Sequence, residues 1–431
     1  MQADPQPGPA MYELVRSLYP ICRSITGEGV RQTLAQLREL IPLEVHQVPS
    51  GTAVFDWTVP REWNIRDAWV KNAAGERVID FQRHTLHVVS YSVPVRARMT
   101  LTQLRPHLHT LPDQPELIPY RTSYYQEDWG LCLPHRQLEQ LPEGEYEVCI
   151  DSTLQDGHLN WGECLLPGEL EDEVLLSCHV CHPSLCDDNL SGIAVATFLA
   201  RELAAAPRRY SYRFLFVPGT IGSIAWLHRN QARTHRIRHG LVLTCLGDSA
   251  GFTYKRSRRG EAEIDRALEH VLAHCGAPSE LVDFSPYGYD ERQYNSPGFD
   301  LPVGCLMRSQ HGCFPEYHTS ADDLDFVRPE SLAQSLALLR SVVRVLEDNR
   351  CYRSLNPFCE PQLGRRGLYA GLGGTQIRTL QMAMLWVMNQ SDGTHSLLDI
   401  AQRAGLPFDT VAEAARLLVR GELITATAPP A

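Results

Sequence analysis

The spacing of apolar residues changes twice along the first half of the chain. Over residues 11–40, leucines recur at helical intervals on both sides of Gly27 and Gly29, which predicts two helices joined by a turn. From about 51 to 130 the pattern consists of short runs rich in Val, Tyr and Trp, interrupted by prolines. Runs of this kind predict a compact β-rich subdomain.

Strand-like and helical patterns alternate after about residue 131. Two helical segments, 192–203 and 264–273, lie among the apolar runs, and an amphipathic helix over 329–347 follows them. The alternation predicts an α/β fold, in which a mixed sheet is flanked by helices. We assign residues 1–50 and 131–350 to this domain and 51–130 to the inserted β-rich subdomain. The predicted strands are 147–150, 174–177, 213–217, 241–244 and 302–305.

The C-terminal part has the pattern of a winged helix. Helices are predicted over 377–388, 396–404 and 410–420, with a tight turn at 404–407 and a wing strand within 422–427. We assign residues 360–431 to this domain. A DNA-reading third helix needs basic or amide side chains, whereas this one offers Glu413, Arg416 and Arg420 among apolar residues. We therefore expect it to dock a partner protein or a second copy of the chain.

Composition narrows the classes of partner. The formal net charge of -11 argues against a surface for nucleic acid, because phosphate neutralisation requires clustered Lys and Arg. The N-terminus lacks a basic and apolar leader, and no stretch approaches the roughly 20 apolar residues of a membrane span. We expect a cytoplasmic protein that does not bind membranes. The 13 cysteines have no regular spacing, which favours reduced thiols over a disulfide framework.

One segment concentrates groups that can bind a metal. The apolar run 174–177 leads into His179 and His182, and Asp187 and Asp188 follow before a helix. Binding crevices of open α/β sheets lie beyond the carboxyl ends of strands, where ligands from several loops can meet. Imidazole and carboxylate are the ligands of hydrolytic zinc sites. His318 lies in a similar polar turn after another strand-like run.

Other interpretations of these residues exist. Taken singly, the histidines can be ordinary loop residues, and Asp187 or Asp188 can cap the helix that follows. Cys181 beside His182 can instead form a thiol nucleophile, although nothing in the sequence identifies its base. A structural zinc finger is disfavoured because Cys178, Cys181 and Cys186 have no distant Cys-x-x-Cys partner.

The order of these motifs resembles the zinc aminopeptidases that use a co-catalytic metal pair. It is most similar to aminopeptidase-like proteins of polysaccharide and natural-product biosynthesis loci, which carry a C-terminal winged helix. The resemblance implies an aminopeptidase-like α/β domain, a β-rich insertion and a zinc site of one or two ions. The motifs that carry it are Phe55-Asp-Trp-Thr-Val-Pro60, Leu86-His-Val-Val-Ser-Tyr-Ser92, Cys181-His-Pro-Ser184, Asp188-Asn-Leu-Ser-Gly192, Thr220-Ile-Gly-Ser223 and Tyr317-His-Thr319.

The resemblance also implies roles for individual residues. His179 is the first metal ligand, Asp188 the bridging carboxylate and His318 the last ligand. Asp290 resembles an acidic residue that shapes the far side of the pocket.

The chain departs from the parent pattern after two of its strands. The parent family has two adjacent glutamates after its third strand, one the general base and one a ligand, whereas this chain reads Val217-Pro-Gly-Thr-Ile-Gly-Ser223. Gly219 stands where the general-base glutamate is expected, and Thr244 falls near a ligand aspartate. We expect Asp248 and His182 to compensate as ligands, and the candidates for the base are Glu316, Glu291 and Asp187.

These features predict a metal-dependent hydrolase, either an aminopeptidase or an N-deacylase. Its substrate would be an amide of a small peptide-like or amino-sugar biosynthetic intermediate. The alternative is a catalytically degenerate scaffold, whose pocket binds a ligand and whose winged helix docks a partner.

Overall fold

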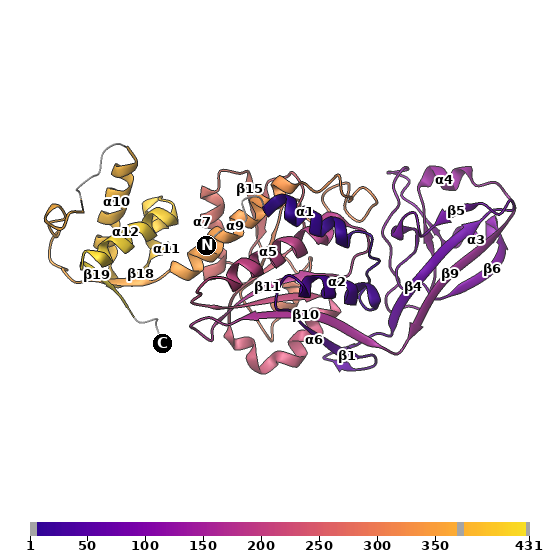
Figure 1. The fold of residues 1–431 in the computed structure, drawn as a ribbon, viewed down its shortest axis with the longest axis horizontal. Coiled ribbons are helices and arrows are strands. Elements are labelled where there is room, and N and C mark those ends of the chain that lie inside the picture. The colour runs from indigo at the N-terminus through magenta and orange to yellow at the C-terminus, as the bar shows by residue number, and fades with distance from the viewer. Residues whose placement is uncertain (1–6, 369–374, 428–431) are drawn as a thin grey trace. The chain divides into compact units, whose positions relative to one another are not determined.

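The computed structural model describes residues 7–368 and 375–427 (Figure 1). The chain forms two compact units. The first contains the residues up to 262 together with 278–336, and the second combines 263–277 with the chain from 337 onward. Each unit has its own sheet and helices.

An eight-stranded sheet organises the first unit. Its order is β1-β10-β12-β11-β13-β16-β14-β15. The central strands β12, β11, β13 and β16 run parallel to one another. On the two sides of this group, β1 pairs with β10, β10 with β12, and β14 with β16, each in antiparallel fashion. The predicted mixed sheet is confirmed. The strands are β1 (Glu44–Pro49), β10 (His158–Leu166), β11 (Glu173–His179), β12 (Ser211–Val217), β13 (Ile237–Leu243), β14 (Phe252–Lys255), β15 (Ser279–Val282) and β16 (Val303–Met307).

Helices cover both faces of this sheet, as adjacent residues of β10 show. A side chain at Gly162 would meet Leu34 of α2, whereas Glu163 accepts a hydrogen bond from Trp226 of α6. Because neighbouring residues of a strand point to opposite faces, α2 and α6 lie on opposite sides. The helices of this unit include α1 (Pro7–Leu18), α2 (Glu28–Arg38), α5 (Gly192–Ala204), α6 (Ile221–Asn230) and α8 (Glu291–Tyr294).

The inserted subdomain is built on a four-stranded antiparallel sheet, ordered β5-β4-β9-β6. Its strands are β4 (Glu62–Lys71), β5 (Arg77–Asp80), β6 (Val95–Thr100) and β9 (Glu145–Gln155), the last of which leads into β10. The prediction that 147–150 belongs to the alternating α/β sheet was wrong, because these residues lie in β9. Every second side chain of β9 is buried, as expected for a sheet with one covered face.

The second unit contains the winged helix. Helices α10 (Thr375–Gln390), α11 (Leu397–Ala404) and α12 (Phe408–Arg420) confirm the three predicted helices, and β19 (Ile424–Ala426) confirms the wing strand. Ser396 and Asp399 form a reciprocal capping box at the start of α11. The three-stranded sheet also includes β17 (Cys351–Ser354) and β18 (Asp392–Ser396), which the sequence did not predict, and α7 (Glu263–His274) and the end of α9 (Pro329–Asp348) complete the unit.

Two global expectations can be compared with the described residues. Across 7–368 and 375–427, no helix has the length and apolar character needed to cross a bilayer. All 13 cysteines are free thiols.

Candidate metal centre

The candidate site begins where β11 ends. Every residue of β11 is buried, and the strand pairs with the parallel strands β12 and β13 on its two sides. His179 is its last residue, so the imidazole emerges at the carboxyl edge of the sheet while remaining 2% exposed. This is the edge at which the sequence predicted the ligands to meet.

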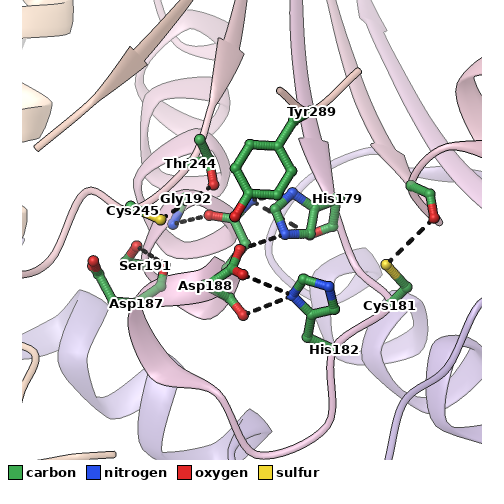
Figure 2. A network of polar contacts seen from close by, with 12 residues as sticks. His179, Cys181, His182, Asp187, Asp188, Ser191, Gly192, Thr244, Cys245 and Tyr289 are labelled. Carbon is green, nitrogen blue, oxygen red and sulfur yellow. Dashed lines mark hydrogen bonds and ion pairs between the residues drawn. The ribbon is translucent and has the colours of Figure 1, made fainter. Parts of the chain in front are cut away.

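Three histidines converge on the carboxylate of Asp188. Figure 2 shows two of them, His179 and His182. The Nε2 atom of His179 lies 2.7 Å from Oδ1, and Nδ1 of His182 lies 3.1 Å from Oδ2. His318 reaches the same Oδ2 atom with its Nε2 at 2.9 Å. Residues 130 positions apart therefore meet at one fully buried carboxylate.

Asp322 fixes the loop that carries Asp188. Its carboxylate accepts hydrogen bonds from the backbone N–H groups of Cys186 at 3.1 Å, Asp187 at 2.6 Å and Asp188 at 3.0 Å. Asn189 adds a link to the sheet by donating to the carbonyl of Leu243 at 3.0 Å. The buried side chains of Asp322 and Asn189 thus hold the turn before α5, and neither residue was assigned a role from the sequence.

The protonation states suit metal binding. Burial by itself raises the pKa of Asp188, but His182 and His179 lower that pKa well below its ordinary value. Burial lowers the pKa of both His179 and His318, whereas Asp188 outweighs burial and raises the pKa of His182. The carboxylate and the neutral imidazoles of His179 and His318 are in the form that binds a metal, whereas His182 would release any proton that it carries on binding.

The donor set fits a divalent transition metal. Among the described residues, the ligand atoms of His179, His182 and Asp188 lie within 4.8 Å of one another. Two imidazoles and a carboxylate form a typical three-ligand catalytic zinc set that leaves a position open. His318 contacts the same carboxylate and can approach an ion held there.

Asp248 and Asp187 have other partners. Asp248 accepts hydrogen bonds from the N–H groups of Ala250 at 2.6 Å and Ser309 at 3.0 Å, and it is not a member of the histidine cluster. Asp187 accepts from the N–H of Gly247 at 2.7 Å, and in Figure 2 it points away from the labelled histidines. Burial, with Asp248 next in size, raises the pKa of Asp187 well above its ordinary value.

The two glutamates predicted as possible bases differ in their surroundings. Glu291 is buried and forms an ion pair with Lys255 at 2.5 Å, so its charge is already balanced. Glu316 is half-buried, and its side chain has no hydrogen bond or ion pair within the described chain. Its backbone carbonyl accepts from the Thr319 hydroxyl at 2.8 Å.

The thiol of Cys181 is poorly suited to nucleophilic attack. Its Sγ lies 3.8 Å from the carbonyl oxygen of Gly219, and the side chain is buried. Burial raises the pKa of Cys181 to about 12. Since the thiolate is the reactive form, this environment disfavours the Cys-His alternative.

A pair of tyrosines lines the histidines and was not assigned a role from the sequence. The ring of Tyr289 stacks on His179 at 4.5 Å, and the ring of Tyr317 stacks on His318 at 3.9 Å. The two tyrosine hydroxyls form a hydrogen bond of 3.0 Å. Tyr317 lies in the Tyr317-His-Thr319 motif and Tyr289 directly precedes Asp290, but their separation in the sequence gives no sign that the tyrosines meet.

The inserted subdomain also reaches the site. The backbone N–H of Tyr120 donates to the carbonyl of His318 at 2.8 Å, and Pro119 forms a β-bridge with Thr319. The ring of Tyr120 meets the rings of His182 and His318 edge-on, at 5.1 and 5.0 Å. Residues of the insertion therefore form part of the wall around the histidines.

The loop after β12 carries no acidic side chain. An ideal Cβ placed on Gly219 would lie 3.4 Å from Cβ of His179 and 3.6 Å from Oδ2 of Asp290. Thr244 follows β13, and its hydroxyl lies 3.6 Å from the sulfur of Cys245. Gly219 and Thr244 therefore offer the site no carboxylate ligand.

Sequence comparisons place both units of the chain in known families. Residues 12–349 match the family described as "Domain of unknown function (DUF4910)", and residues 350–426 match a winged helix-turn-helix family. A protein of Clostridium acetobutylicum is 52% identical over 425 residues, covering 98% of each chain. It is provisionally named a polysaccharide biosynthesis protein with an aminopeptidase-like domain.

Solved structures give the same result for the fold. A crystal structure of a provisionally named peptidase from Clostridium acetobutylicum, 52% identical, has a TM-score of 0.94 and covers 97% of this chain and 96% of that chain. A zinc aminopeptidase from Bacillus subtilis has a TM-score of 0.55 at 13% identity, covering 79% and 94%. The chain therefore belongs to the DUF4910 family and is an aminopeptidase-like protein with a C-terminal winged helix.

Proposed function

We propose that this protein is a metal-dependent hydrolase that cleaves an amide of a small, peptide-like or amino-sugar biosynthetic intermediate. The observation that carries the proposal is the convergence of His179, His182 and His318 on the buried Asp188. The aminopeptidase-like fold supports the reaction class. The name of the Clostridium relative supports a biosynthetic setting.

His179, His182 and Asp188 would hold the metal, with His318 as a further ligand. Zinc is the ion that this donor set favours. When bound, it supplies Lewis acidity, which polarises an amide carbonyl and makes water acidic enough to attack at neutral pH.

The tyrosine pair can orient the amide. The hydroxyl of Tyr289 donates a hydrogen bond to the hydroxyl oxygen of Tyr317. The O–H group of Tyr317 therefore remains free to donate a hydrogen bond to another acceptor. Stacking on His179 and His318 holds both rings beside the ligands. We infer that the Tyr317 hydroxyl donates a hydrogen bond to an oxygen of the substrate.

Metal analysis and hydrolysis assays test the proposal together. Purified protein is loaded with zinc, dialysed, and assayed with a panel of aminoacyl and N-acyl p-nitroanilides, beside His318→Ala. We expect bound zinc and turnover in the wild type, and loss of turnover with weaker zinc binding in the variant. If both quantities are unchanged in His318→Ala, the proposal is wrong.

A catalytically degenerate scaffold is the second candidate, and the missing acidic side chains at Gly219 and Thr244 favour it. A general base typically contributes roughly 10² to 10⁴ in rate, so its loss can leave a pocket that binds without rapid turnover. A fully folded protein that binds no zinc and hydrolyses none of the panel would support this candidate.

We also propose that the winged helix docks a protein and not DNA. The arginines of α12 are engaged by carboxylates: Arg416 pairs with Glu413 at 3.0 Å and with Asp348 at 3.3 Å, and Arg420 lies 3.6 Å from Glu413. Phosphate binding would have to compete with these pairs. A duplex-binding assay at low salt tests this, and tight binding would contradict it.

A further inference from the structure

Asp290 is a buried carboxylate beside the metal ligands that has no cationic partner among the described residues. It is 1% exposed and directly precedes α8. Its Oδ1 atom accepts a hydrogen bond from the hydroxyl of Ser223 at 2.8 Å. Within the described chain, Oδ2 accepts no hydrogen bond, and no Lys, Arg or His lies within ion-pair distance.

The neighbouring Glu291 provides a contrast within the same turn. Its carboxylate is paired with Lys255 at 2.5 Å, and Lys255 also donates to the carbonyl of Tyr287 at 2.7 Å. The buried lysine thus balances Glu291 and ties down the loop before Asp290. Asp290 is left as the carboxylate of this turn that lacks a counter-ion.

Gly219 leaves the space between Asp290 and His179 without a side chain. Its missing side chain would point between His179 and the two oxygens of Asp290, which lie 3.6 and 3.7 Å from the ideal Cβ position. Gly219 itself is partly exposed, whereas Asp290 is buried beneath it. Any side chain at this position would stand against the carboxylate, so glycine keeps the carboxylate open to a bound molecule.

The electrostatics indicate which group Asp290 can bind. A buried charge is costly unless it is paired, and the structure supplies the pairing charge for Asp188 and Glu291 but not for Asp290. A substrate ammonium group would supply the missing cation and a hydrogen-bond donor for Oδ2. An N-acylated amine keeps an N–H donor but is neutral, so it would not supply the cation. Burial, supported by the charge of Glu291, raises the pKa of Asp290 to about 7, although Ser223 and the more distant Arg292 lower it.

We propose that Asp290 binds the free ammonium group of the substrate across Gly219, so that the site selects amine-bearing amides over N-acylated ones. The inference rests on the proposed hydrolase function and deepens it, because it favours aminopeptidase-type over N-deacylase-type substrates. It gives Gly219 a role as an opening, and not only as the site of a lost base.

A binding experiment tests the proposal without requiring turnover. Two zinc-directed probes with the same carbon skeleton are compared by isothermal titration calorimetry on the zinc-loaded full chain: L-leucine hydroxamate, which has the α-amine, and 4-methylpentanohydroxamate, which lacks it. We expect wild type to prefer the amine-bearing probe by roughly 10- to 100-fold, the range for a charge-assisted hydrogen bond. Asp290→Asn, which keeps the shape of the side chain, should reduce the preference to within about threefold.

Two further variants locate the amine. Gly219→Ala places a methyl group against the carboxylate and should lower the preference without altering zinc content. Adding Gly219→Glu to Asp290→Asn returns a carboxylate to the opening and should restore the preference. Asp283→Asn, at an exposed carboxylate, is the matched control and should behave as wild type. Zinc content and the melting temperature are measured for every variant.

The outcomes separate the inference from the function on which it rests. If wild-type protein binds neither probe, the proposed metal site and this inference fail together. If wild type binds both probes equally, or if Asp290→Asn keeps the preference, only the inference is overturned. It is also overturned if Gly219→Ala keeps the wild-type preference while the double variant shows none, because the amine then lies elsewhere.

Discussion

Asp188 and Asp290 are two buried carboxylates near His179 with opposite surroundings. Asp188 is contacted by three imidazoles, and its pKa is held well below the ordinary value despite its burial. Asp290 receives one hydroxyl hydrogen bond, and burial raises its pKa to about 7. Burial alone therefore does not decide the charge of a carboxyl group, because the neighbours that the fold brings to it can reverse the direction.

The same contrast distinguishes the loops that follow adjacent strands. The loop after β11 keeps a complete set of metal-binding groups, whereas the loop after β12 has Gly219 in place of an acidic residue. Among the described residues, the β11 side therefore offers ligands for a metal, whereas the β12 side lacks an acidic one.

Asp188→Asn should have the largest effect. Removing the charge leaves three histidines around a neutral amide, so we expect zinc affinity to fall by at least about 100-fold, and hydrolysis with it. Zinc affinity is measured by competition with a chromogenic chelator. Asp187→Asn is the matched control, since that carboxyl group faces away from the histidines and its raised pKa favours the neutral form. Equal losses in the two variants would contradict the assignment.

Asp322→Ala should rank second. The variant leaves three backbone N–H groups of the Asp188 loop without their acceptor, so we expect the free energy of unfolding to fall by roughly 2–4 kcal/mol. Zinc affinity should also fall, by about 10- to 100-fold, because an outer-shell partner has been removed. Urea denaturation of the metal-free protein measures the first quantity. Unchanged stability would show that the loop does not depend on this carboxylate.

Asp290→Asn should change the pH dependence of stability. A carboxyl group whose pKa is raised in the folded state stabilises the fold below its unfolded pKa of 3.8, and this stability is lost as pH rises through about 7. We therefore expect metal-free Asp290→Asn to be more stable than wild type at pH 8, by an amount on the order of 1–3 kcal/mol, and to differ less at pH 5. Urea denaturation at both pH values measures this. A variant that is less stable at pH 8 would contradict the absence of a counter-ion.

Tyr317→Phe should have the smallest effect on the fold. It removes the hydroxyl that accepts from Tyr289 but keeps the ring stacked on His318, so we expect a loss of about 0.5–1.5 kcal/mol in stability. Zinc content should be unchanged, whereas turnover should fall if this hydroxyl orients the substrate. Loss of zinc would instead show that the stacked ring depends on the hydroxyl to hold His318.

Local patterns in the chain were enough to predict the alternation of strands and helices, the three helices of the winged helix, and the candidate ligands His179, His182, Asp188 and His318. These features are readable because periodicity and residue chemistry are local properties of the chain. The run at 147–150 was assigned to the wrong sheet for the same reason. The local pattern of apolar residues shows that a strand forms, but the strand with which it pairs depends on residues that are distant in the sequence.

The folded structure was needed to tell which acidic residues lie at the site. Asp187, Asp248, Glu291 and Glu316 all qualified by residue type, yet backbone amides engage the first two and Lys255 balances the third. Asp322 and the tyrosine pair acquire their roles from contacts across long stretches of chain. The charge and reach of a buried polar group depend on its three-dimensional neighbours, and sequence spacing does not specify them.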